Sequence, residues 1–105
     1  MPYSDETIEE IYTSHCLEHI KDLNFVMEEC FRVLVKGGIM HIKVPSWKTS
    51  HSFRDPSHIR YFTPDTFSYF TKEFSEVAHF RTKCDFKIKE MKLENPFEIE
   101  VFLEK

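Results

Sequence analysis

The sequence predicts an α/β fold in which about four strands form one sheet. Three observations predict it. A strand-like segment, an amphipathic helix and a second strand follow one another within the first part of the chain, a later helix opens with capping residues, and the chain ends in two strand-like runs. A strand–helix–strand order needs a crossover connection, so the first two strands are expected to be parallel. The 105 residues fit a single domain, residues 1–105.

The first strand is predicted over Glu10–Ser14, because β-branched and aromatic residues gather there. A helix is predicted over Leu23–Val35, with Asp22 as its N-cap. Its apolar residues recur at the three-and-four spacing of one buried stripe, formed by Val26, Met27, Cys30, Phe31 and Leu34. Gly37 or Gly38 is expected to supply the left-handed residue that ends this helix.

The second strand is predicted over Ile39–Pro45, and it leaves the sheet at its proline, which cannot donate to a ladder. After a polar and aromatic loop, Thr63 and Pro64 open another helix as N-cap and first helical residue. Its broad aromatic face is expected to consist of Phe67, Tyr69, Phe70 and Phe74. For the segment Ser75–Cys84, helix and coil both remain open.

The chain ends in a predicted antiparallel hairpin, whose runs FKIKEMKL and FEIEVFL are separated by Glu94–Pro96. The second run alternates strictly, with Phe97, Ile99, Val101 and Leu103 as its apolar members. In the first run the apolar phase shifts between Ile88 and Met91, which predicts a bulge near Glu90. Lysines of one run face glutamates of the other, so we interpret them as charge pairs on a solvated face.

Composition narrows the classes of function. The formal net charge of −4 argues against a general affinity for nucleic acid or for an anionic membrane. No apolar run approaches the ~20 residues that span a bilayer, and the N-terminal MPYSDETIEEIY lacks the basic and apolar regions of a secretory signal. The 3 cysteines are scattered and odd in number, which favours a reducing cytoplasm over a disulfide framework.

The segments MPYSDETIE, SHCLEHI, RVLVKGG and IKVP follow one another in the sequence. In this order they resemble class I (Rossmann-like) S-adenosylmethionine-dependent methyltransferases. That family has a loop of the form LPFPDNSFD, a strand ending in SHVLEHI, a helix ending in RVLKPGG and a strand ending in VP. The counterparts here read MPYSDETIE, SHCLEHI, RVLVKGG and IKVP. The stretch DPSHIRYFTPDTF is similar to a loop and helix of the same family. Val35 and Lys36 depart from the family's Lys-Pro, although both glycines of the turn remain.

The resemblance implies the C-terminal half of that fold, namely strands four to seven of a partial Rossmann-like sheet with two or three helices. The glycine-rich turn that lets the backbone approach the cofactor, and the acidic residue that binds its ribose, have no counterpart in this sequence. Strand four lies in the middle of the family's sheet, so the strand at Glu10–Ser14 is expected to be an exposed edge here. We therefore expect self-association, or a partner that carries the missing strands.

The candidate site follows the first strand, where open α/β sheets place their ligands. The resemblance implies contacts with S-adenosylmethionine from Tyr3, Ser14, His15 and Cys16. It implies contacts with the substrate from Glu18, His19 and Arg60. It also makes His15 and His58 the candidate catalytic bases, because a methyl acceptor often has to lose a proton.

Structural interpretations stay open for the same residues. Glu18 and His19 could shape the turn into the helix, with His19 capping or packing. His58 could bind backbone after a turn at Asp55, while Arg60 forms a surface ion pair. Cys16 is interpreted as a small buried residue, because methyl transfer needs no thiol nucleophile.

A metal site is the remaining alternative. His15, Cys16 and His19 offer three zinc ligands within five positions, and His51 and His58 could approach from the loop. However, no second pair of ligands occurs at finger-like spacing, and Cys30 belongs to the buried stripe. The sequence therefore predicts no metal.

Two functions from different classes follow. The first is a methyltransferase-like protein, truncated or split, that transfers a methyl group to a small molecule, lipid or sugar once a partner completes it. The isolated chain is then expected to bind S-adenosylmethionine weakly or not at all. The second is a non-catalytic interaction module that associates through its exposed strand edge. Neither function involves nucleic acid or a membrane.

Overall fold

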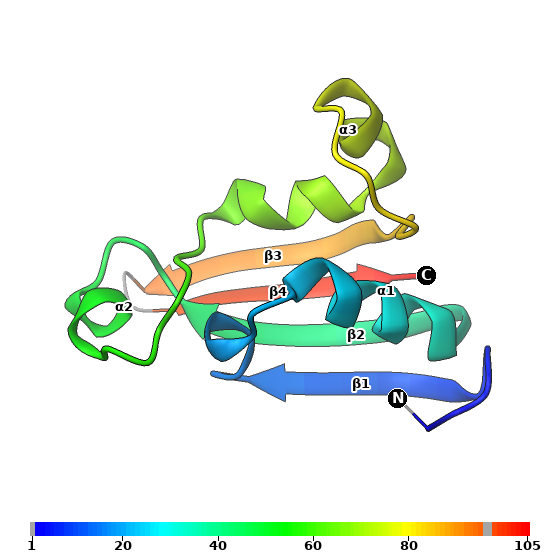
Figure 1. Cartoon of the computed structure of the whole chain (residues 1–105), viewed down its shortest axis with the longest axis horizontal. Coiled ribbons are helices and arrows are strands. Elements are labelled where there is room, and N and C mark those ends of the chain that lie inside the picture. Colours follow the sequence, from blue (N-terminus) through cyan, green and yellow to red (C-terminus); the bar gives the residue numbers. More distant parts are fainter. Residues whose placement is uncertain (1, 96–97) are drawn as a thin grey trace.

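A four-stranded mixed sheet organises the chain (Figure 1). The computed structural model describes residues 2–95 and 98–105, without the side chains of His51, Glu94 and Asn95. The strands are β1 (Ile8–Ser14), β2 (Leu34–Pro45), β3 (Lys87–Asn95) and β4 (Glu98–Glu104), in the order β1-β2-β4-β3. β1 pairs with β2 in parallel, and β4 is antiparallel to both β2 and β3. The predicted α/β class and the antiparallel final pair are therefore confirmed.

Helix α1 (Leu23–Val33) connects the parallel pair, and Asp22 caps it as predicted, since Oδ1 accepts a hydrogen bond of 3.0 Å from the Phe25 N–H. The helix ends two residues before the predicted boundary, because Leu34 is already extended. The predicted glycine cap is wrong. The carbonyl of Val33 instead accepts from the Thr7 N–H at 2.8 Å, so the segment before β1 satisfies the end of the helix.

The two glycines serve the start of β2 instead. Gly37 adopts the left-handed conformation, with a φ of 81°, and its N–H donates to the carbonyl of Lys105. Gly38 lies so close to its neighbours that a Cβ there would be 2.8 Å from the carbonyl oxygen of Val35. The pairing of β1 with β2 shifts register beside this segment, between Ile8 and Glu10.

The helix predicted at Thr63-Pro64 is divided into two pieces. Pro64–Phe70 forms a 3₁₀ helix, η2, and Lys72–Val77 forms α3. Thr71 between them is extended, and its Oγ1 accepts a hydrogen bond from the Phe74 N–H. The predicted aromatic face is divided accordingly: Phe67 and Phe70 are buried, whereas Tyr69 and Phe74 are exposed. Within the segment that stayed open between helix and coil, the helix ends at Val77.

The core lies against one face of the sheet. Alternating residues of β2 and β4 are fully buried, as is Leu34 at the start of β2; the alternating residues are Met40, Ile42, Val44, Ile99, Val101 and Leu103. The predicted helical stripe packs on them, and the core is completed by Phe62, Phe67 and Phe86. Their neighbours along the strands point to the opposite, more open face, where the His41 ring stacks on that of Phe102 and lies 4.7 Å from that of Tyr12.

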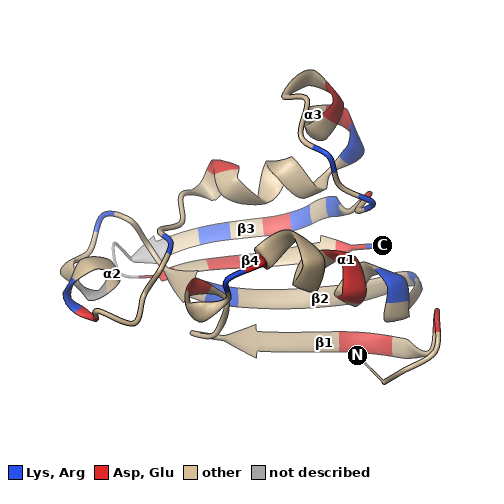
Figure 2. Cartoon of the chain, in the orientation of Figure 1, with Lys and Arg blue, Asp and Glu red and all other residues tan. Residues whose placement is uncertain are grey.

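The hairpin of β3 and β4 carries alternating charges (Figure 2). The predicted bulge is confirmed, because the register of β3 against β4 shifts between Ile88 and Glu90. Lys89 Nζ lies 3.9 Å from Glu104 Oε2, which confirms cross-strand charge pairing. Pro96 and Phe97, predicted in the turn and on the apolar face, lie outside the described residues.

Two short helices complete the fold, the 3₁₀ helix η1 (Leu17–His19) after β1 and α2 (Ser50–Arg54) after β2. Both lie beyond the carboxyl ends of the parallel strands, beside the site described below (Figure 1). Among the helices in the described part of the chain, none is long and apolar enough to cross a membrane.

Candidate functional site

An open cavity of about 450 Å³ lies where β1 and β2 end. Its lining residues are His15, Glu18, His19, Pro45, Arg54, Asp55, His58 and Glu98. The carboxyl ends of parallel strands meet at one edge of a sheet, which is the usual place for a ligand in open α/β folds. The volume falls within the range of about 300–1,000 Å³ that is typical of small-molecule pockets.

His15 occupies the turn directly after β1. Its φ of 53° is left-handed, and its N–H donates to the carbonyl of Lys43 at 2.9 Å. Such a backbone is uncommon for a residue other than glycine and is often found at functional sites. Its Nε2 lies 3.2 Å from Glu98 Oε1. That carboxylate favours a proton on Nε2, which leaves Nδ1 of the neutral ring free to accept a proton.

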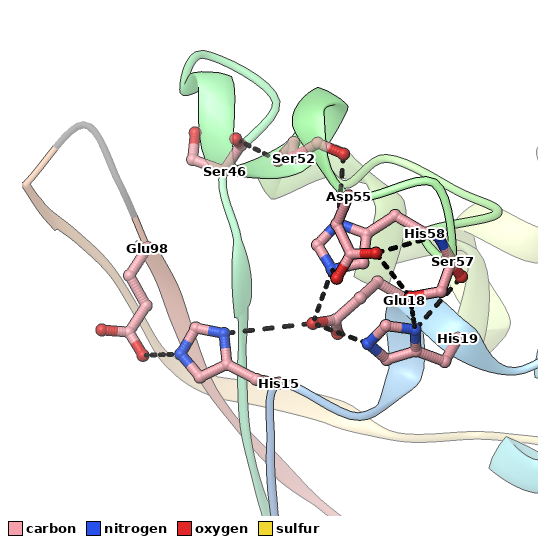
Figure 3. Close-up of polar contacts among 9 residues, drawn as sticks. All are labelled: His15, Glu18, His19, Ser46, Ser52, Asp55, Ser57, His58 and Glu98. Atoms are coloured by element: carbon pink, nitrogen blue, oxygen red, sulfur yellow. Dashed lines mark hydrogen bonds and ion pairs between the residues drawn. The ribbon is translucent and has the colours of Figure 1, made fainter.

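Glu18 lies at the centre of the site, and its side chain is only 2% exposed. Its Oε2 is 3.9 Å from His15 Nδ1, 3.9 Å from His19 Nε2 and 3.8 Å from His58 Nε2 (Figure 3). These separations are too long for hydrogen bonds. The other oxygen, Oε1, is buried and has no hydrogen-bond partner among the described residues. A buried carboxylate with so few partners is costly, so packing alone does not account for it.

His19 and His58 are held by their other ring nitrogens. His19 Nδ1 lies 3.1 Å from the carbonyl oxygen of Ser57, and His58 Nδ1 lies 3.1 Å from that of Ser52. A carbonyl only accepts, so each Nδ1 carries the hydrogen and each neutral ring presents its Nε2 lone pair to Glu18. The two rings meet edge to face, with centroids 4.7 Å apart. The structural interpretation that His58 binds backbone is confirmed.

Asp55 adds a second carboxylate close to this cluster. The Ser57 hydroxyl and backbone N–H donate to Asp55 Oδ1 at 2.7 and 2.9 Å, and these hydrogen bonds lower the pKa of the carboxyl. Asp55 Oδ2 lies 3.6 Å from His58 Nε2. The cavity therefore combines three imidazoles with the carboxyl groups of Glu18, Asp55 and Glu98, and Arg54 is the one arginine in its lining.

The structure brings four of the predicted site residues into this cavity, namely His15, Glu18, His19 and His58. Arg60 does not reach it, because its guanidinium donates to the carbonyls of Ile20 and Lys21 rather than forming the surface ion pair that was the alternative. Tyr3, Ser14 and Cys16 are exposed and do not line the cavity. The expectation that Cys16 is buried is wrong, because it precedes η1, whose buried residues are Leu17 and Glu18.

Sequence reasoning missed four lining residues, which are Pro45, Arg54, Asp55 and Glu98. Glu98 was interpreted as part of a solvated hairpin face. The strand register would have placed Glu98 at the site, because Glu98 is the cross-strand partner of Pro45 at the end of β2. Asp55 had been given only the role of a turn residue.

The lining residues fit only part of S-adenosylmethionine. Charged side chains such as Arg54 and Glu98 suit the carboxylate and ammonium of its methionine end. Pro45 is the one aliphatic residue of the lining, so the adenine ring would meet mainly imidazoles and charged side chains there. The chain's 2 glycines, Gly37 and Gly38, lie at the other end of β2 and cannot offer a backbone cradle. The described residues therefore do not hold the whole cofactor by themselves.

Comparisons with known proteins agree with this architecture. Residues 1–42 match the model of the methyltransferase domain family. A SAM-dependent methyltransferase from Archaeoglobus fulgidus superposes with a TM-score of 0.68 at 17% identity, over 98% of this chain and 62% of that one. The complex of the Haloferax volcanii Trm112 methyltransferase activator with a putative methyltransferase gives 0.69 at 12% identity, over 99% and 56%. The [4+2]-cyclase SpnF gives 0.70 at 13% identity, over 100% and 52%.

The chain has the fold of part of a class I SAM-dependent methyltransferase, and residues 1–42 are similar to the methyltransferase domain family. The chain spans between 52% and 62% of the length of these three structures. None of the curated proteins is significantly similar in sequence. Because one of the structures is described as a cyclase, this fold by itself does not fix the reaction.

Proposed function

We propose that this chain contributes the acceptor side of a SAM-dependent methyltransferase, whose cofactor site is completed by strands from a second copy or from a partner. The methyl acceptor would be a small molecule, a lipid or a sugar. One observation carries the proposal: the segment that matches the methyltransferase domain family includes His15, Glu18 and His19, which line the cavity at the carboxyl ends of β1 and β2.

The chemistry required of this chain is to hold an acceptor and to remove its proton. When bound, S-adenosylmethionine supplies the activated methyl group. His15 is the first candidate base, because Glu98 favours the tautomer with a free Nδ1. His58 is the second, since its Nδ1 is held by the carbonyl of Ser52 and its Nε2 is free to accept. Glu18 and His19 would orient the acceptor beside them.

The contacts with cofactor or substrate that the resemblance implies for four further residues remain proposals, because these residues do not line the cavity. Ser14 and Cys16 flank His15, and their backbone would face the methionine part of the cofactor. Tyr3 and Arg60 lie outside the cavity lining. For them to contact cofactor or substrate, added strands would have to extend the site toward them.

The free edge of β1 supports the need for completion. Within the described part of the chain β1 pairs on one side only, with β2. Tyr12 is 57% exposed, and the partly buried Thr13 hydroxyl has no hydrogen-bond partner there. The methyltransferase in the Haloferax volcanii complex is bound to an activator protein, so completion by a partner has a parallel among proteins of this fold.

Calorimetric titration with S-adenosylmethionine and S-adenosylhomocysteine tests the proposal, on samples whose oligomeric state is fixed by sedimentation. Micromolar binding by a self-associated chain, abolished by His15→Ala, would support completion of the site by a second copy, whereas the isolated chain is expected to bind weakly or not at all. His79→Ala is the matched control, because His79 is exposed and does not line the cavity. A folded, associated sample that releases no heat would contradict cofactor binding by this assembly.

The second candidate is a non-catalytic module that pairs with another protein through the edge of β1. The same exposed edge and the partial fit to S-adenosylmethionine favour it. The two candidates differ in what His15→Ala does. Replacing His15 would disable a methyltransferase, but it would leave association through β1 unchanged.

The domain organisation, cellular location and partners of the protein are also proposals. We propose that residues 1–105 act as one domain in the cytoplasm, on a small-molecule substrate, without nucleic acid or a membrane as partner. The unpaired state of Cys16, Cys30 and Cys84 is compatible with a reducing compartment.

A further inference from the structure

We propose that Glu18, His19 and His58 bind one divalent transition-metal ion of the Zn²⁺ type. Each of the three residues offers a ligand atom, and these atoms all lie within 4.8 Å of one another. Two imidazoles and one carboxylate form a donor set that suits Zn²⁺ and neighbouring first-row ions.

The separations fit an ion between the three groups. Glu18 Oε2 lies 3.9 Å from His19 Nε2 and 3.8 Å from His58 Nε2. Ligand atoms at about 2.0–2.1 Å from a tetrahedral ion are about 3.3 Å apart. Each imidazole would therefore have to approach Glu18 by about 0.5 Å, and the two imidazoles, whose ligand atoms lie within 4.8 Å of one another, would have to approach each other by up to about 1.5 Å. Rotation about side-chain bonds supplies such a movement without a change in the backbone.

Both histidines already have the support that metal-binding histidines usually have. The Nδ1–H of His19 donates to the carbonyl of Ser57, and that of His58 donates to the carbonyl of Ser52. These bonds fix the tautomer that leaves Nε2 free and orient each ring toward Glu18 (Figure 3). A histidine that served only to pack would not need its Nε2 lone pair aimed at a carboxylate.

Glu18 supplies an independent observation. Its side chain is 2% exposed, its Oε1 has no hydrogen-bond partner, and its Oε2 faces acceptor nitrogens at distances too long for hydrogen bonds. Apart from these imidazoles, no cationic side chain among the described residues pairs with the Glu18 carboxylate. An ion at the centre of the cluster would satisfy the carboxylate and both lone pairs together.

The cluster opens into the cavity on the side of His15 and Asp55. Asp55 Oδ2 is 3.6 Å from His58 Nε2, so it is close enough to serve as a further ligand. Coordination positions left by the protein would face the space proposed for the acceptor. The ion-binding proposal does not depend on the proposed methyl transfer, because it requires no cofactor and no added strands. With an ion bound, His58 Nε2 is a ligand, and His15 is then the candidate base.

Titration of the metal-free chain, without an affinity tag, tests this site. Calorimetry with Zn²⁺ measures stoichiometry and affinity, and Co²⁺ reports the ligand field through its visible absorption. We expect one ion per chain, with the affinity lowered at least about tenfold in each of Glu18→Gln, His19→Ala and His58→Ala. His79→Ala should bind as tightly as the parent chain.

Far-UV circular dichroism confirms that each variant is folded before its titration is interpreted. If Glu18→Gln does not fold, the partly exposed His19 and the loop residue His58 still decide the question through their own variants. Binding that survives all three substitutions, or that falls equally in His79→Ala, would overturn the proposal, as would the absence of binding to the folded parent chain. A positive result here together with a negative cofactor titration would keep the metal site and reject cofactor binding by the self-associated chain.

Discussion

At the scale of single residues, the three cysteines lie in two different environments. Burial raises the pKa of the Cys30 thiol to about 11 and that of the Cys84 thiol to about 12, so both stay protonated at neutral pH. Cys16 is exposed. We expect one thiol to react rapidly with Ellman's reagent in the folded chain, and all 3 to react after denaturation. The rapid phase should disappear in Cys16→Ser, and a second rapid thiol would show that the core around Cys30 and Cys84 is open.

The left-handed backbone of His15 gives a second prediction at this scale. Its φ of 53° carries a steric cost for any residue with a Cβ, but none for glycine. His15→Gly should therefore be more stable to urea than His15→Ala by about 1 kcal/mol, although both lose the imidazole. Equal stability of the two variants would mean that this turn relaxes out of the left-handed region.

Four of the eight lining residues of the candidate site were predictable from the sequence, but the other four and the arrangement of the site were not. His15, Glu18 and His19 follow a strand end, which is a local signal that a single sequence carries. Their meeting with His58 depends on the loop after β2 folding back, where the Ile59 N–H donates to the carbonyl of Glu18. No spacing of residues in the sequence encodes that contact. A search for the ligand spacings of zinc fingers therefore does not find a set of metal ligands that includes His58.

At the scale of elements, the start of β2 depends on its two glycines in different ways. Gly37 has open space for a Cβ but a φ of 81°, so Gly37→Ala should cost about 1 kcal/mol of unfolding free energy. Gly38→Ala would place its Cβ against the backbone carbonyl of Val35 and should cost about 2–3 kcal/mol. Urea unfolding of both variants measures the difference. A smaller loss for Gly38→Ala than for Gly37→Ala would contradict the close approach.

The pairing of β2 with β4 includes a pH-sensitive contact. His41 Nε2 lies 2.6 Å from Glu100 Oε2, and this hydrogen bond lowers the pKa of Glu100 below the ordinary value of 4.5. A lowered carboxyl pKa stabilises the folded state above the ordinary value, and this contribution is lost as the pH falls through the folded pKa. The stability difference between the parent chain and Glu100→Gln should therefore be largest above about pH 4.5 and should shrink below it. A difference that does not change with pH would exclude the charged pair.

Element types were more predictable than their ends. Alternation in β4 and the helical stripe of α1 arise from burial on one face, which a pattern reports directly. The end of α1 depends on a partner elsewhere in the chain, because the Thr7 N–H donates to the carbonyl of Val33. The local sequence therefore predicts which face of an element is buried, but it does not predict a hydrogen bond to a distant residue.

At the scale of the whole molecule, the exposed edge determines how the chain associates. The sheet ends at β1 in the described part of the chain (Figure 1), and Ile11 of this strand stays only partly buried, unlike its cross-strand neighbour Met40 of β2. An unpaired edge with an exposed aromatic residue is a template for a further strand. The order β1-β2-β4-β3 makes this the edge at which a strand of a second copy or of a partner would extend the sheet beside the cavity.

Self-association through this edge should respond to a single charge. Lysine on an edge strand opposes pairing with another strand, so Tyr12→Lys should shift the sedimentation profile of the chain from oligomer to monomer. Val77→Lys introduces the same charge on α3, where the side chain is 78% exposed, and it should leave the oligomer intact. Because Tyr12 also lies beside the ring of His41, both variants should first be compared by thermal unfolding. If the folded Tyr12→Lys variant remains as associated as the control, the contact between copies does not involve β1, and completion of the site through that edge must be abandoned.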